Sequence, residues 1–263
     1  MGSLFDPARQ KAFGTLLCGI GALVLTAPVL RAGEHVVDIN QLVAETQKQT
    51  AEANKLMMVW WMPEAFWRAT LTQGQAMTAA GADQFLSVLR PYVLVAVVDG
   101  SIGPLGGMTF MDQAALASTI RLVDGLGARY SPFDVKDLTS DARNLSAMMR
   151  PVLSSMIGQM GENMHFFFFP STDVNGDRIA DAAKPGGFAI ELGQEVFRWK
   201  LPLGSVLPRK VCPEDGETMN GAWNYCPWHG TELVHQKSEI EAEDQGKDPS
   251  QEKTEDEGMA SGG

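Results

Sequence analysis

The strongest constraint on the fold is a series of short apolar segments, each closed by a glycine, proline or asparagine turn signal. The clearest example is residues 188–200, where apolar residues alternate with polar and charged ones on either side of Gly193. Successive side chains of a β-strand point to opposite faces. The alternation therefore predicts a β-hairpin with Phe197 and Trp199 on one face and the neighbouring basic residues on the other.

Similar segments precede this hairpin. They predict a strand over residues 92–98, a return strand over 106–110, further strands over 120–123, 128–130 and 164–169, and a tight turn at Asn175-Gly176. The fold class predicted is therefore mainly β with inserted helices (α+β), as an antiparallel β-sandwich centred between Tyr92 and Leu201. The buried residues are expected to include Val95, Val97, Leu122, Phe167, Phe169, Ile190, Phe197 and Trp199.

Helical patterns flank and interrupt these strands. Residues 38–57 read as a polar helix, 57–62 as a buried strand, 64–68 as a helical turn and 83–90 as another helix. Apolar residues at three- and four-residue steps predict a further helix over 145–160, which Pro151 should kink or split.

The order of two segments within the predicted sandwich resembles exported bacterial proteins of the immunoglobulin-like family. They are Ile-Arg-Leu-Val-Asp, Gly, Ala-Arg-Tyr at 120–130 and Phe-Phe-Phe-Phe-Pro at 166–170. The resemblance implies an immunoglobulin-like sandwich and no particular activity.

The N-terminus is typical of an export signal. Arg9 and Lys11 precede the uncharged run 12–30, and Ala32 offers a small residue before a cut. An uncleaved membrane anchor is a second interpretation, since 19 residues just span a bilayer. A buried core helix is a third. Either membrane interpretation places the folded part outside the cytoplasm, in the periplasm or at the outer face of the envelope.

The charge pattern describes the other end of the chain. Residues 236–263 hold nine acidic residues, three lysines and no aromatic residue, which predicts a disordered acidic tail. The whole chain of 263 residues has 21 basic and 32 acidic residues. This balance argues against a nucleic-acid partner, because such proteins need a basic surface.

The most specific motif for chemistry is a repeat near the C-terminus. Residues 212–216 and, 14 positions later, residues 226–230 both read Cys-Pro-x-ligand-Gly. The pair resembles the two knuckles of a zinc ribbon, which normally read Cys-Pro-x-Cys-Gly, although Asp215 and His229 stand where that family has cysteine. The resemblance implies one structural Zn²⁺ held by Cys212, Asp215, Cys226 and His229, with no open position for catalysis.

Two alternatives to zinc remain open for this motif. If the leader with Cys18 is removed, Cys212 and Cys226 are the remaining cysteines and could form a disulfide in an oxidising compartment. The motif could also be a relic that holds neither. A disulfide alone, however, requires neither the repeated proline and glycine nor Asp215 and His229 at matched offsets.

Weaker patterns have simpler explanations. Asp173, Asn175, Asp177 and Asp181 alternate as in a calcium loop, but a hairpin turn accounts for them. The 14 methionines could bind copper(I), but core filling is the better account. Residues 60–67 carry three tryptophans that could form a glycan platform or a packed seam between strand and helix.

The predicted organisation has five parts: a signal peptide or membrane anchor (1–32), a helical N-terminal region with one short strand (33–91), the sandwich with an inserted helix (92–207), a zinc-ribbon-like module (208–235) and the acidic tail (236–263). No common hydrolase or phosphate-loop motif occurs in the sequence. The first functional hypothesis is therefore an exported, non-enzymatic interaction or assembly protein with a protein partner and a structural zinc module. The second is an envelope-polymer binding protein or hydrolase that uses the Trp60–Trp67 region.

Overall fold

The structure is a computed structural model that describes residues 35–50, 52 and 54–235. The predicted leader (1–32) and the predicted acidic tail (236–263) lie outside the described residues. Across the described ranges, no helix combines the length and apolar character that a bilayer crossing requires.

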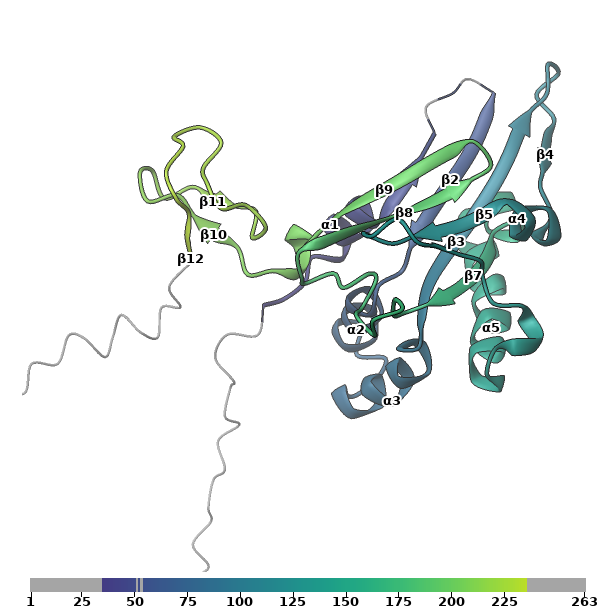
Figure 1. The fold of residues 1–263 in the computed structure, drawn as a ribbon, viewed down its shortest axis with the longest axis horizontal. Helices are drawn as coiled ribbons and strands as arrows, with labels where there is room; N and C mark the ends of the chain where they lie inside the picture. The colour runs from purple at the N-terminus through teal and green to yellow at the C-terminus, as the bar shows by residue number, and fades with distance from the viewer. Residues whose placement is uncertain (1–34, 51, 53, 236–263) are drawn as a thin grey trace, which may run out of the picture. The chain divides into compact units, whose positions relative to one another are not determined.

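The described chain is a mixed α and β protein whose sheets are antiparallel (Figure 1). The first sheet has the order β1-β2-β3, and both β7 and β4 pair with β3, at residues 92–97 and 100–102 respectively. The second sheet has the order β6-β5-β8-β9. The strands of the first sheet are β1 (Gln47–Gln49), β2 (Lys55–Trp61), β3 (Tyr92–Ile102), β4 (Met108–Phe110) and β7 (His165–Pro170). Those of the second are β5 (Ile120–Val123), β6 (Arg129–Tyr130), β8 (Gly186–Leu192) and β9 (Glu195–Leu201).

A third, small sheet belongs to the C-terminal module, with the order β11-β10-β12. Its strands are β10 (Lys210–Val211), β11 (Thr218–Met219) and β12 (Val234–His235). The helices are α1 (Ile39–Thr46), α2 (Glu64–Gln73), α3 (Ala79–Leu89), α4 (Gln113–Thr119), α5 (Ser140–Ile157) and α6 (Gln159–Glu162), with short 3-10 turns at Val135–Asp137 and Gly204–Val206.

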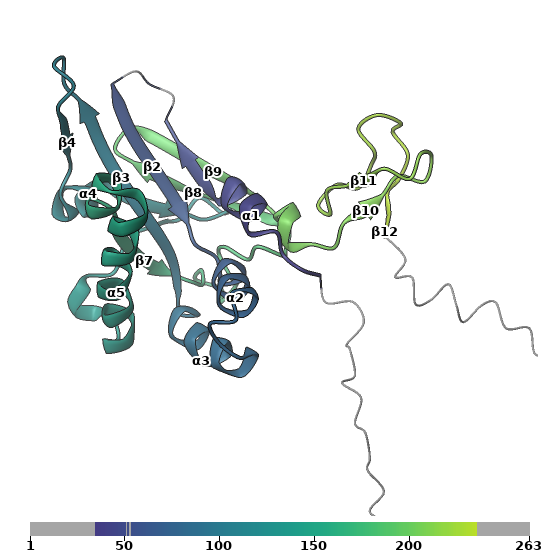
Figure 2. The same cartoon turned by 180° about the vertical axis from the view of Figure 1, so that it is seen from behind.

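The first sheet is buried on both faces, which explains why β3 is apolar over most of its length. Val93, Val95 and Val97 contribute to one hydrophobic cluster together with residues of the second sheet, such as Ile190 and Trp199. The alternate β3 residues, by contrast, belong to a second cluster that includes residues of α3 and α5. Figure 2 shows where these two helices and β3 lie in the fold. A strand covered on both faces loses the apolar–polar alternation of a half-exposed one.

The predicted core is confirmed residue by residue. All eight residues expected to be buried are buried and lie in the cluster shared by the two sheets: Val95, Val97, Leu122, Phe167, Phe169, Ile190, Phe197 and Trp199. The hairpin is confirmed too, since β8 pairs with β9 from Gly186↔Leu201 to Leu192↔Glu195. Along β9, Phe197, Trp199 and Leu201 are buried, and the alternate residues Val196, Arg198 and Lys200 are exposed.

The polar helix predicted over 38–57 is wrong in length. Asp38 caps α1 by accepting hydrogen bonds from the backbone N–H groups of Asn40 and Gln41, but the helix ends at Thr46. Residues 47–49 form β1, which pairs with β2. Because β1 lies at the edge of the sheet, its sequence is polar and gives no strand signal. The region 33–91 therefore supplies two strands where one was expected.

Two helix boundaries also differ from the prediction. The helix expected from residue 83 begins four residues earlier, at Ala79, because the Thr78 side chain accepts a hydrogen bond from the Gly81 N–H and caps it. The helix expected over 145–160 runs from 140 to 157 with Pro151 inside it, and the break before α6 comes at Gly158, where φ is 57°.

Candidate functional site

The two Cys-Pro-x-ligand-Gly repeats fold into matching knuckles. In the first, the Cys212 N–H donates a hydrogen bond to the Glu217 carbonyl at 3.0 Å, and in the second the Cys226 N–H donates to the Thr231 carbonyl at 2.8 Å. In each repeat the glycine N–H donates back to the cysteine carbonyl at 2.9 Å. The sequence repeat therefore encodes the same backbone turn twice.

The flanking strand pairs repeat as well. Val211 pairs with Thr218 across the first knuckle, and Tyr225 forms an antiparallel bridge with Glu232 across the second, at the same offsets from each cysteine. The glycine that ends each repeat has a positive φ, 75° at Gly216 and 69° at Gly230. Only glycine adopts this conformation at little cost, which explains why glycine occurs at this position in both repeats.

The knuckles bring three of the four predicted ligands together. The Nδ1 atom of His229 lies 3.3 Å from the Cys212 Sγ and 3.6 Å from the Cys226 Sγ. The ligand atoms of these three residues all lie within 4.8 Å of one another. Tetrahedral zinc, with bonds of about 2.3 Å to sulfur and about 2.0–2.1 Å to nitrogen, places sulfur and nitrogen about 3.5 Å apart. The observed spacing suits a metal of this size.

Asp215, the fourth predicted ligand, lies beside this cluster and is not one of the three residues that converge. Its Oδ2 atom is 3.7 Å from the His229 Nδ1, while its Oδ1 atom accepts a hydrogen bond from the Glu217 N–H at 2.9 Å. That bond closes a local turn. The carboxylate therefore has one oxygen on the side of the imidazole.

Hydrogen bonds around Cys212 favour the thiolate form of this one cysteine. Burial would raise the pKa of the Cys212 thiol, but hydrogen bonds from the backbone N–H groups of Glu214 and Asp215 and from the His229 ring lower it below its ordinary value. The hydrogen bond with Cys212 raises the pKa of His229 despite partial desolvation, and the charge of Asp215 adds to this rise. A thiolate is the metal-binding form of cysteine.

The disulfide alternative concerns the same two thiols. Both cysteines are free and buried in this structure. Since their sulfur atoms lie in one cluster, oxidation to a disulfide competes with metal binding for the same side chains.

The weaker sequence patterns find structural roles. Asp173 accepts hydrogen bonds from the N–H groups of Asn175 and Asp177 and so forms the predicted turn. Many of the methionines lie in the core, among them Met58 and Met164. The tryptophan-rich segment packs as a seam rather than an exposed platform, as seen in the edge contacts of Trp60 and Trp67 with Phe66.

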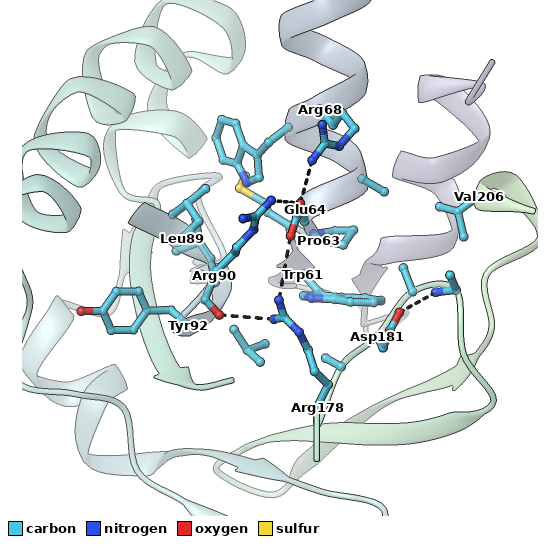
Figure 3. A pocket seen from close by; sticks show the side chains of 18 residues that line it. Trp61, Pro63, Glu64, Arg68, Leu89, Arg90, Tyr92, Arg178, Asp181 and Val206 are labelled. Carbon is cyan, nitrogen blue, oxygen red and sulfur yellow. Dashed lines mark hydrogen bonds and ion pairs between the residues drawn. The ribbon is translucent and has the colours of Figure 1, made fainter. Parts of the chain in front are cut away.

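A cavity beside this seam was missed by the sequence reasoning. It measures about 290 Å³ and is lined by residues within 61–68, 89–94 and 178–183 (Figure 3). Three arginines reach it from distant parts of the chain: Arg68, Arg90 and Arg178. No motif spacing links these positions, so no local pattern in the sequence signals the cavity.

Glu64 lies at the centre of this group of arginines. Its Oε1 atom is 2.9 Å from Arg68 Nη2 and 3.4 Å from Arg90 Nη2. Burial would raise the pKa of the Glu64 carboxyl, but the hydrogen bonds from Arg68 and Arg90 lower it below its ordinary value. Glu64 is therefore ionised at neutral pH, which is the wrong state for a general acid.

Comparison of the chain with protein-family models, with curated proteins and with solved structures finds no match.

Proposed function

We propose that this chain is an exported, non-enzymatic interaction or assembly protein whose C-terminal module, residues 208–235, is held together by a structural Zn²⁺. Cys212, Cys226 and His229 are the proposed ligands, with Asp215 completing the tetrahedron. The observation that carries the proposal is the pair of matching knuckles that set two sulfurs and one ring nitrogen at zinc-ligand spacing. The same observation supports the resemblance to a zinc ribbon.

The small core of the module supports a structural role for the metal. Its buried apolar cluster consists of four residues, Cys212, Met219, Cys226 and Leu233, and two of these are proposed ligands. A core of this size buries too little apolar surface to offset the entropy of ordering the chain. A bound metal supplies the missing stability, as in other small metal-dependent domains.

The surface of the module supports a role in binding a protein partner. Trp223, Tyr225 and Trp228 are 45%, 63% and 73% exposed although they are large aromatic residues. Exposed tryptophan and tyrosine are typical of residues that provide binding energy at protein interfaces. A rigid metal-held turn would present them with little loss of conformational freedom on binding.

We propose a β-sandwich for the body of the protein, with the two larger sheets as its layers. The hydrophobic cluster that draws residues from both sheets supports this arrangement. The closer resemblance to the immunoglobulin-like family stays a prediction.

The proposed export rests on the sequence of the first 33 residues. Fusion of residues 1–40 to a reporter that is active only outside the cytoplasm should give an active reporter. A matched fusion with Arg9 and Lys11 replaced by glutamate should lose most of the signal, because the basic region orients the leader. A stable but inactive wild-type fusion would contradict export.

Asp215 offers a direct test of the ligand set. Asp215→Cys restores the usual knuckle and should tighten zinc binding by about ten-fold or more, since zinc favours a thiolate ligand. Asp215→Ala should weaken binding by a similar factor while the body stays folded. Competition with a chromophoric chelator measures both affinities.

Glu214, which precedes Asp215 in the same knuckle, provides a matched control for this pair. Its carboxylate is not among the proposed ligands, so Glu214→Ala should leave the affinity within about two-fold of wild type, a surface effect within ±0.5 kcal/mol. Equal affinities for wild type, Asp215→Cys and Asp215→Ala would remove Asp215 from the ligand set.

The second functional hypothesis, polymer binding or hydrolysis at residues 60–67, gains one supporting observation. Several residues of that segment, including Trp61, Glu64 and Trp67, line the cavity. Ionisation of Glu64 argues only against a general-acid role for it, whereas the arginines around it supply donors for an anionic group and so support binding.

A further inference from the structure

We propose that the cavity formed by the start of α2, the start of β3 and residues 178–183 is a binding site for the carboxylate or phosphate group of a small ligand. This site is separate from the zinc module, and the inference does not depend on the proposed function.

The charge at this cavity is opposite in sign to the net charge of the chain. The chain has a formal net charge of −11, yet three guanidinium groups line this one cavity. Glu64 and Asp83 are the carboxylates paired with them: Arg68 Nη2 lies 2.9 Å from a carboxylate oxygen of each. Asp181, on another part of the wall, has its own partner in Lys184 at 3.5 Å. The group as a whole therefore keeps an excess of positive charge.

The three arginines carry more hydrogen-bond donors than the protein around them has acceptors. A guanidinium group has five N–H donors. Within the described residues, Arg68 and Arg90 direct only Nη2 toward carboxylates. Arg178 Nη1 donates to the Arg90 carbonyl at 3.2 Å, and its Nη2 lies 3.9 Å from Glu64 (Figure 3). The remaining donors, including the three Nε–H groups, have no acceptor in the described part of the protein and are open to water, since the three side chains are 37%, 46% and 40% exposed.

Two further kinds of donor belong to the wall of the cavity. No side chain caps α2, and its first residues, Glu64 and Ala65, line the cavity. The first N–H groups of a helix lack intrahelical acceptors, and the helix dipole there favours a negative charge. The Nε1 atom of Trp67, another lining residue, is buried without a hydrogen-bond partner among the described residues. A ligand that brings acceptor oxygens would pair with these donors in place of water.

The fold positions the backbone of two of these arginines. Arg90 caps the C-terminus of α3, and Arg178 is held by a bridge to Thr172 at the end of the Asp173–Asp177 turn. The turn that resembled a calcium loop in sequence therefore positions a cation at the cavity. Arginine presents a planar pair of donors that matches the oxygens of carboxylate and phosphate groups.

The volume of the cavity and the apolar part of its wall limit the size and chemical class of the ligand. About 290 Å³ is at the lower end of the range for small-molecule pockets. Trp61, Leu89 and Tyr92 supply an apolar part of the wall. The ligand class is therefore a small molecule, or the end of a polymer, with one anionic group beside an apolar portion.

The test uses the full chain and two simple probes, inorganic phosphate and acetate, each titrated at ionic strength matched with chloride and followed by tryptophan fluorescence and calorimetry. We expect saturable binding of at least one probe. Arg178→Gln should weaken it about ten- to a hundred-fold, the usual effect of losing hydrogen bonds to a charged group. Binding of phosphate alone would identify a phosphate site, and binding of acetate a carboxylate site.

Arg209→Gln is the matched control, because Arg209 is an exposed arginine outside this cavity and should leave binding unchanged. If Arg178→Gln does not fold, Arg90→Gln replaces it with the same expectation. Failure of both probes to saturate, or equal binding by the wild type and the folded cavity variant, would overturn the proposal. Equal weakening by Arg209→Gln would overturn it too, since it would indicate unspecific charge attraction.

Discussion

Replacing Cys226 with serine should weaken zinc binding by more than about 100-fold, beyond the 10–100-fold that loss of an outer-shell partner costs. The module 208–235 should unfold with it, because its four-residue core contains the lost ligand. The two larger sheets have their own core and should stay folded. Chelator competition measures the affinity, and the signals of Trp223 and Trp228 in an amide NMR spectrum report the state of the module.

The two histidines of the module provide the matched control for this prediction. His229→Gln should behave like the cysteine variant, because its Nδ1 atom lies between the two sulfurs. His235→Gln should bind zinc like the wild type, since His235 lies on β12 and is not among the three convergent residues. An ordered module in metal-free Cys226→Ser would show that the metal is not what stabilises it.

The second large effect is expected at Trp61 in the body of the protein. Trp61 is 1% exposed and makes edge contacts with Phe188 and Trp199, which stack on each other at 5.0 Å. Trp61→Ala leaves a large cavity in the core shared by the two sheets. We expect a loss of about 3–5 kcal/mol in the free energy of unfolding. In a domain of this size the loss lowers the Tm by about 10 °C.

Trp228→Ala is the control for this prediction, because Trp228 is largely exposed. Its change in unfolding free energy should stay within about 0.5 kcal/mol, as for most surface positions. Urea denaturation followed by far-UV circular dichroism measures both variants. Equal stabilities of Trp61→Ala and the wild type would mean that the two sheets do not share a core at this point.

The sequence predicted the core well where side-chain alternation determined which face is buried. In β9 the alternation of Phe197 and Trp199 with basic residues specifies the register, because a slip by one residue would expose both rings. The apolar part of β3, residues 92–98, was predicted as a strand from its β-branched residues. Its burial on both faces follows from the second sheet on one face and from α3 and α5 on the other, and their placement is a matter of tertiary packing.

The prediction failed where local pattern and tertiary structure disagree. Residues 47–49 carry a polar sequence that suits a helix, yet pairing with β2 makes them a strand. The arginine-lined cavity was missed for a related reason. Arg68, Arg90 and Arg178 are far apart in the chain, and only the packing of α2, β3 and the 178–183 segment brings them together.

The candidate metal centre was the most predictable site because its geometry is local. Each knuckle is a short turn with its own hydrogen bonds and its own glycine, so the spacing within each repeat fixes where its ligands point. The position of Asp215 was less predictable. Its side chain can satisfy the Glu217 N–H as well as a metal, and the motif does not distinguish these two uses.

Native mass spectrometry of the full chain, purified without added metal or reductant, tests the central claim most directly. The account predicts one zinc ion per chain with Cys212 and Cys226 both reduced, and loss of that zinc in His229→Gln but not in His235→Gln. Acid should release the metal, because the thiols and the imidazole must lose their protons to bind it. A zinc-free chain that is two hydrogens lighter, with a Cys212–Cys226 disulfide, would contradict the account.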